Sequence, residues 1–129
     1  MDSSFTPLER AALDAILAET GDHRAAVECQ LLRATVRARE NTGGGFFVHL
    51  NVPDEVELLN LKSAPLGEDV WIGVDGMEYG LGAILHCKHG CVSLLEGYAV
   101  GPEDTSSIDF GHVSYAIIKA PGRFPERSR

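Results

Sequence analysis

The chain has 129 residues, of which 44% are hydrophobic and 23% charged, and its formal net charge is −8 at pH 7. One domain is expected at this length, and such a chain buries enough surface to fold without a disulfide or a metal. The excess of acidic residues argues against binding to nucleic acids or anionic membranes, because their phosphate groups repel an acidic protein. No signal peptide or membrane-spanning apolar run is recognisable, and the three cysteines indicate reduced thiols in a cytosolic protein.

Two short helices are predicted at the N-terminus. Thr6 is a suitable N-cap, Pro7 fits the first helical position, and Glu9 completes a capping box with Thr6. Apolar residues then recur at helical spacing, and Gly21 is a natural left-handed stop. A second helix is expected from Asp22, as its cap, to about Cys29, with Cys29 turned toward the core.

A β-hairpin is predicted after these helices, because the hydrophobic period changes from helical to two at Leu32. Residues 32–39 and 46–52 alternate between apolar and polar side chains, and the turn-rich segment 40–45 joins them. Pro53 ends the second strand, since proline cannot donate to the hydrogen-bond ladder. The hairpin is expected to have one apolar face and one face rich in arginine, threonine, histidine and asparagine.

Three further strands are predicted between Asp69 and Val100 as an antiparallel meander. Asp75-Gly76 and His89-Gly90 are both expected to form two-residue turns. The two turns agree on one apolar face, and a slip of one residue would reverse every side chain. That face is predicted to comprise Val70, Ile72, Val74, Met77, Tyr79, Leu81, Ala83, Leu85, Cys87, Val92 and Leu94, with Glu96 as a carboxylate among them.

These elements predict a single α+β domain over residues 1–120. Two N-terminal helices are expected to pack with an antiparallel sheet of five to six strands, made of the hairpin, the meander and a last strand near residues 113–118. Residues 121–129 contain two prolines and three arginines and are expected to form a flexible tail.

The polar face of the hairpin is the first candidate site, for an anionic ligand. Guanidinium groups at alternate strand positions would bind a carboxylate or phosphate in a bidentate manner, and an aromatic ring would stack on a flat ligand. The competing explanation is a solvated face whose arginines offset nearby acids. It is the favoured one, because surface charges usually need no special role. The candidate ligand-binding residues are Arg33, Arg37, Arg39, Phe47, His49 and Glu96.

Glu96 belongs to this set because a carboxyl group on an apolar face would suit general acid–base chemistry. The favoured alternative is a bulge at Gly97 that turns Glu96 to solvent or toward an arginine. Residues 86–91 hold two histidines and two cysteines, but the register sends Cys87 to the core and His86 outward, and one zinc ion does not easily take ligands from both faces. No metal or other cofactor is predicted, and the absence of a nucleophile or P-loop motif makes an enzyme the less favoured class.

The other face of the meander is a candidate interface. Trp71 falls opposite Gly80 in the predicted register, where its ring would cover the bare backbone. An apolar patch left uncovered by the helices would mark a protein interface. The predicted interface residues are Trp71, Ile84 and Leu95, and a homodimer through them is a hypothesis.

Three segments resemble those of small uncharacterised bacterial proteins: RENTGGGFF (residues 39–47), GMEYGLG (76–82) and LLEGY (94–98). The resemblance covers most of residues 33–100 and implies only a bacterial, cytosolic origin. The function expected first is a non-enzymatic binding module, such as a toxin-neutralising or accessory protein that acts through its acidic surface. The alternative is a small-ligand, anion-binding domain or small enzyme that uses Arg37, His49 and Glu96.

Overall fold

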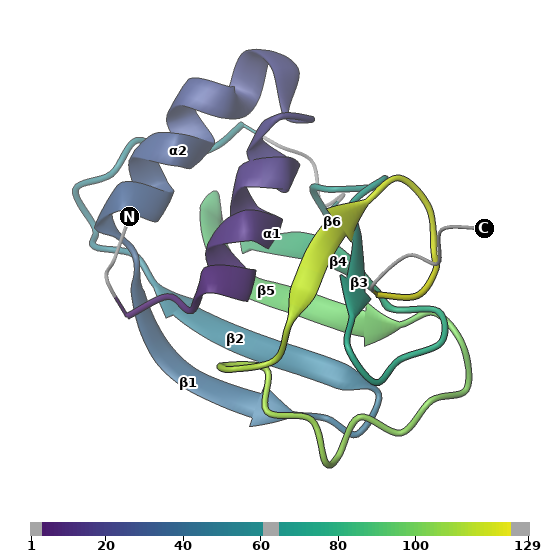
Figure 1. The fold of residues 1–129 in the computed structure, drawn as a ribbon. Helices are drawn as coiled ribbons and strands as arrows, with labels where there is room; N and C mark the ends of the chain where they lie inside the picture. Colours follow the sequence, from purple (N-terminus) through teal and green to yellow (C-terminus); the bar gives the residue numbers. More distant parts are fainter. Residues whose placement is uncertain (1–3, 61–64, 125–129) are drawn as a thin grey trace.

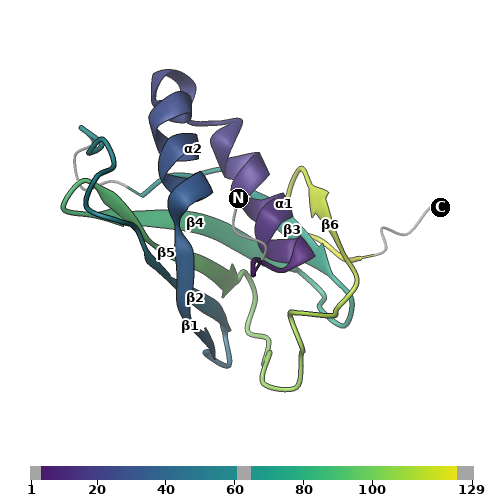
Figure 2. The same cartoon turned by 90° about the vertical axis from the view of Figure 1, so that its left-hand side faces the viewer.

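The computed structural model describes residues 4–60 and 65–124. Two helices lie on the same face of a six-stranded antiparallel sheet (Figures 1 and 2), which confirms the α+β prediction. The strand order is β1-β2-β5-β4-β3-β6. The elements are α1 (Pro7–Leu17), the short 3-10 helix η1 (Gly21–His23), α2 (Arg24–Arg33), β1 (Thr35–Asn41), β2 (Gly45–Asn51), β3 (Trp71–Val74), β4 (Leu81–Lys88), β5 (Cys91–Ala99) and β6 (Tyr115–Ile118).

Helix α1 begins as its sequence predicts. The Glu9 N–H donates to Thr6 Oγ1 at 3.2 Å, and the Thr6 N–H donates to Glu9 Oε1 at 2.9 Å, so the capping box is complete. Leu13 and Ile16 are fully buried where the helix packs against β4 and β6. The helix ends at Leu17, before the predicted stop at Gly21, whose φ of 57° is left-handed as expected.

Helix α2 differs from the prediction at both ends. It begins at Arg24 without a side-chain cap and continues to Arg33, past the expected end near Cys29. Val27 and Leu31 are buried at helical spacing against the sheet, whereas Cys29 is exposed. The first strand was predicted to begin too early, because the helical pattern of buried residues in α2 continues almost to the start of β1.

A buried glutamine joins α2 to two distant segments. Gln30 is fully buried, and its Nε2 donates to the carbonyls of Glu57 and Gly90 at 2.8 and 2.9 Å. Its Oε1 accepts from the Val92 N–H at 2.8 Å. The side chain therefore satisfies three backbone groups that belong to the 53–60 loop and to the β4–β5 hairpin.

The β1–β2 hairpin buries Phe46, Val48 and Leu50 of its predicted apolar face, whereas Ala38, predicted on the same face, is exposed because β1 contains a bulge. Val36 pairs with Leu50 and Ala38 pairs with His49, so Arg37 is the extra residue. Beyond the bulge, Arg39 lies opposite the buried Val48, on the side of the helices. The prediction that Arg39 shares a face with His49 is therefore wrong.

The meander of β3, β4 and β5 forms, with a wider first connection than predicted. The Asp75-Gly76 turn is closed by a hydrogen bond of 2.9 Å from the Met77 N–H to the Val74 carbonyl. Strand β4 begins only at Leu81. Tyr79 is consequently 49% exposed rather than part of the apolar face.

The β4–β5 hairpin turns at His89-Gly90 as predicted, but β5 then carries a second bulge. Cys87 pairs with Val92, whereas the next pair along is His86 with Leu94, which leaves Ser93 as the extra residue. All side chains of β5 after Ser93 therefore point to the face opposite to the predicted one.

This second bulge corrects three placements. Leu95 is fully buried and faces Leu85 in the core, although it was predicted on the other face. Leu94 and Glu96 leave the apolar stripe for the face turned away from the helices. The favoured alternative for Glu96, a bulge that redirects it, has the right effect, but the bulge lies at Ser93 and not at Gly97.

The segment after β6 returns along the β3–β4 connection. The Gly122 N–H donates to the Tyr79 carbonyl at 3.0 Å, and Arg123 Nη2 contacts the Glu78 carboxylate at 2.6 and 2.9 Å. Residues 121–124 are thus held by backbone and ionic contacts, and the remainder of the expected tail lies outside the described residues.

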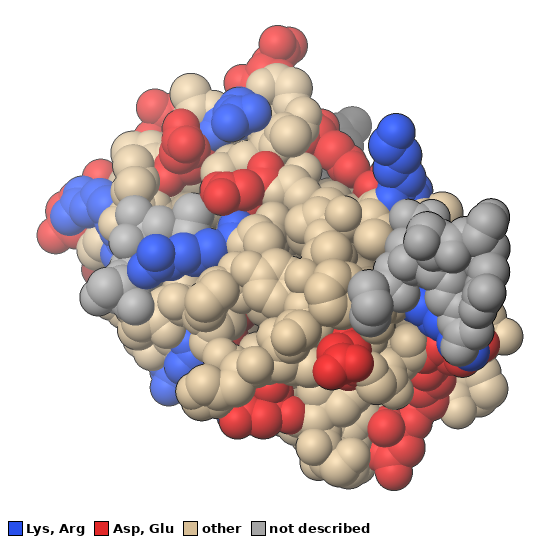
Figure 3. All heavy atoms as spheres, viewed as in Figure 1, with Lys and Arg blue, Asp and Glu red and all other residues tan. Residues whose placement is uncertain are grey.

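The side that carries the helices has a mixed surface. Acidic and basic side chains are interspersed there around an uncharged area (Figure 3). Among the described residues, no helix is long and apolar enough to cross a membrane.

Candidate functional site

The six candidate ligand-binding residues are divided among separate places. Arg33 ends α2 and lies 3.8 Å from Glu55. Arg37 occupies the exposed bulge of β1. Arg39 points to the helix side, so the three arginines share no face. Phe47, His49 and Glu96 do come together, on the opposite side of the sheet.

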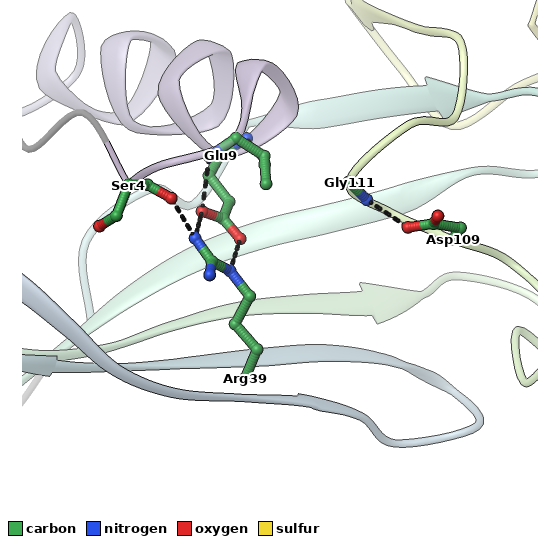
Figure 4. Close-up of polar contacts among 6 residues, drawn as sticks. Ser4, Glu9, Arg39, Asp109 and Gly111 are labelled. Carbon is green, nitrogen blue, oxygen red and sulfur yellow. Dashed lines mark hydrogen bonds and ion pairs between the residues drawn. The ribbon is translucent and has the colours of Figure 1, made fainter.

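Arg39 is held by a buried carboxylate at the start of α1 (Figure 4). Its Nε donates to Glu9 Oε2 at 2.8 Å and its Nη2 to Glu9 Oε1 at 2.9 Å, a bidentate pair that also reaches the Ser4 carbonyl. The Glu9 side chain is 6% exposed and that of Arg39 is 42% exposed. The arginine charge is therefore balanced within the protein, and the pair joins β1 to α1.

The sheet face turned away from the helices gathers the other candidates, and we call it the outer face. Cross-strand pairing arranges it in rows across β1, β2, β5 and β4. One row is Glu40, Phe47, Glu96 and Ile84; the next is Ala38, His49, Leu94 and His86. Tyr98, Trp71 and Ile118 continue the face toward β3 and β6.

Three carboxylates on or beside the outer face each accept a hydrogen bond or pair with a ring nitrogen. Glu40 Oε1 lies 2.8 Å from His49 Nε2, and Glu96 Oε1 lies 2.8 Å from His86 Nε2. Trp71 Nε1 donates to Asp69 Oδ1 at 2.7 Å. The carboxylates are thereby fixed among the aromatic side chains.

The Tyr98 ring lies on this face where Gly82 leaves room for it. A Cβ atom at Gly82 would approach the Tyr98 ring to 2.2 Å, so the ring occupies the space above that glycine. Trp71 pairs with Gly82 rather than with the predicted Gly80. The Phe47 ring lies 6.0 Å from the His49 ring, nearly edge-on.

The candidate interface is partly correct. Trp71 and Ile84 lie half-buried on the outer face, and α1 and α2 lie on the other side of the sheet (Figure 2). Leu95 does not belong to it, because the Ser93 bulge sends it into the core. Leu94 takes its place between the two histidines.

Sequence reasoning missed Glu40, His86, Leu94 and Tyr98. His86 follows directly from the alternation of β4 once Ile84 is placed, whereas Glu40 reaches the outer face only because of the bulge at Arg37. Leu94 and Tyr98 lie beyond the Ser93 bulge, and nothing in the local alternation signals that extra residue.

The cysteines and histidines of residues 86–91 separate as the β4 register requires. Cys87 packs against the core, and His86 pairs with Glu96 on the outer face. In residues 4–60 and 65–124, no group of three or more histidine, cysteine, aspartate or glutamate side chains could hold a metal ion. Burial, and secondarily the neighbouring Cys91, raises the pKa of the Cys87 thiol.

Alkylation is expected to separate the cysteines by environment. Iodoacetamide near neutral pH should modify Cys29 first, because it is exposed, and Cys87 last, because a raised pKa leaves less of the reactive thiolate. Peptide mass mapping over time measures both rates in one sample. Faster labelling of Cys87 than of Cys29 would place Cys29 in the core, as the sequence alone suggested.

Comparison with known proteins adds no relative to this description. No family model matches the chain, no curated protein matches it, and no solved structure matches it. The function is therefore inferred from the chemistry of the residues described above.

Proposed function

We propose that the protein is a non-enzymatic binding module whose outer face binds a basic protein surface. The observation that supports this most directly is that aromatic rings and carboxylates alternate on the face. Phe47 lies between Glu40 and Glu96 in one cross-strand row, and the Trp71 indole is bonded to Asp69. A ring beside a carboxylate suits an arginine, which stacks on the one and pairs with the other.

Charge supports a basic partner over a second copy. The outer face carries the carboxylates of Glu40 and Glu96 with Asp69 at its margin, and Lys88 at the end of β4 is the basic residue that the β4 register places there. A homodimer through this face would set carboxylates against carboxylates. The net charge of −8 has the same sign and would speed the approach of a basic partner.

An arginine-rich peptide tests the proposal. Amide shifts in a two-dimensional NMR titration should concentrate on β2, β4 and β5 with an Arg-Gly repeat peptide, and not with a Glu-Gly repeat. The double variant Glu40→Gln/Glu96→Gln should weaken binding roughly 3- to 30-fold, because it removes two surface ion pairs worth up to ~1 kcal/mol each.

Glu28→Gln is the matched control, since Glu28 is exposed on α2. Glu28→Gln removes one charge and the double variant two, so a loss of binding free energy half as large for Glu28→Gln would mean that only net charge matters, and the proposal would fail. Light scattering gives the mass of the free protein. A stable dimer strengthened by the double variant would favour self-association through the outer face instead.

A further inference from the structure

We infer that β6 pairs antiparallel with β6 of a second copy of this chain, about a two-fold axis at Ala116. β6 is the last strand at its end of the sheet, and within residues 4–60 and 65–124 it pairs with β3 alone. The pairing would join two six-stranded sheets into one. The inference does not rest on the outer-face proposal, because it concerns the open side of β6 rather than the carboxylates and rings of that face.

The open side of β6 presents backbone groups that suit another strand. β3 and β6 pair without a register shift, and the Asp75 N–H continues the ladder by donating to the Ser114 carbonyl at 2.9 Å. Hydrogen-bonded pairs alternate along an antiparallel ladder, so the N–H and C=O of Ala116 point to β3, whereas those of Tyr115 and Ile117 point away from it. A second β6 centred on Ala116 would pair all of these outward groups.

The side chains on the helix side of β6 are apolar and complement their own symmetry mates. Tyr115 and Ile117 lie opposite buried residues of β3, and Ile117 is 42% exposed. An axis at Ala116 sets Tyr115 of each copy opposite Ile117 of the other, and a ring beside a β-branched side chain is a favourable cross-strand pair. The surface over β6 and the neighbouring part of α1 is largely uncharged (Figures 1 and 3).

The charges at the two ends of β6 favour a second copy in the antiparallel direction. Asp75 and Asp109 are exposed and line one shallow hollow with Val113, just before the strand. Lys119 is exposed and directly follows the strand. Pairing about Ala116 sets Lys119 of each copy opposite Val113 of the other, beside its carboxylates, so opposite charges meet twice. Parallel pairing would set like charges together.

Such a dimer would present both outer faces on the same side of the joined sheet, because the two-fold axis of an antiparallel strand pair stands perpendicular to the sheet. A partner with two basic segments would then bind both faces and gain avidity over either one. This consequence rests on the proposed function, whereas the dimer itself does not.

A cysteine at the axis tests the register. Ala116 would face itself in a non-hydrogen-bonded pair, whose Cα atoms lie about 4.5 Å apart, within the roughly 4.4–6.8 Å that a disulfide spans. In a Cys29→Ser background, Ala116→Cys should form a linked dimer on mild oxidation, identified by non-reducing electrophoresis and peptide mass mapping. Ser114→Cys is the matched control, since it would face Ile118 and stay unlinked. Linking of both variants or of neither would overturn the inference.

Sedimentation velocity at increasing protein concentration should show the mass rising from one chain to two. Salt at about 0.15 M largely screens the repulsion between two acidic copies. Ile117→Lys should abolish the dimer, because it places a charge within the apolar pair. Urea unfolding should show that this variant still folds, since the side chain is half-exposed. A mass of one chain throughout would leave the β6 edge to a strand of a different protein and overturn the inference.

Lys119→Glu should weaken the dimer roughly 3- to 30-fold, because two surface ion pairs worth up to ~1 kcal/mol each are lost. Lys88→Glu makes the same change of charge at the exposed end of β4 and is the matched control. Equal weakening by the two variants would mean that net charge alone governs self-association, against the inference. Titration with the arginine-rich peptide reports on the outer face separately.

Discussion

Leu95→Ala is expected to lower the free energy of unfolding by about 2–5 kcal/mol, whereas Leu94→Ala should lower it by about 1 kcal/mol or less. Leu95 is fully buried and pairs with Val48 and Leu85 in the core, so its removal leaves a cavity under the helices. Leu94 is half-buried on the outer face, where water fills the space of a shortened side chain. Urea denaturation followed by circular dichroism measures both values.

The pair of variants is its own control, because the residues are identical and adjacent. A β5 strand without the Ser93 bulge would reverse the two effects, with the large loss at Leu94. Equal losses of unfolding free energy in the two variants would contradict the placement of both helices on one face of the sheet. The dependence of the unfolding free energy on urea should be the same in both variants, which excludes a change in the denatured state.

Gln30→Ala is expected to cost about 2–4 kcal/mol of stability. The substitution leaves the buried Val92 N–H and the part-buried Glu57 carbonyl without their partner, whereas the Gly90 carbonyl still accepts from the Leu59 N–H. Each buried group left unpaired costs about 1–3 kcal/mol, and relaxation of the surrounding loop recovers part of that sum. The same denaturation experiment measures the loss.

Amide hydrogen exchange gives a second, local measurement for this variant. The Val92 amide should exchange much faster in Gln30→Ala, while amides in the middle of β2 change only as far as global stability does. Glu28→Ala, on the exposed side of the same helix, should change stability by less than about 0.5 kcal/mol. A small effect of Gln30→Ala would show that water replaces the amide without loss.

Local chemistry explains what could be predicted of the fold. The Thr6–Glu9 capping box and the His89-Gly90 turn each depend on neighbouring residues, and both form. The Ser93 bulge depends on distant contacts. Next to it, the Val92 N–H bonds to Gln30 of α2, and the Ser93 Oγ donates to the His86 carbonyl at 3.2 Å. Period-two alternation carries no information about either partner.

Bulges that local alternation does not signal also decide which predictions about the candidate site are correct. Phe47 and His49 are predicted correctly on the polar face of the hairpin, and Ile84 on the second face of the meander, because no bulge separates them from their turns; that the two faces are one follows only from the pairing of β2 with β5. Arg33 is the last residue of α2, and Arg39 lies beyond the bulge at Arg37, so the predicted arginine cluster resulted from assuming one uninterrupted strand.

The bulge at Arg37 also bears on assembly, because β1 is an edge of the sheet. Antiparallel pairing of β1 with a second copy about a two-fold axis at Arg37 would set this exposed arginine opposite itself. Like charges facing across strands, together with an interrupted ladder, are among the means by which natural edge strands avoid sheet extension. This edge is thereby protected against fibre-like growth.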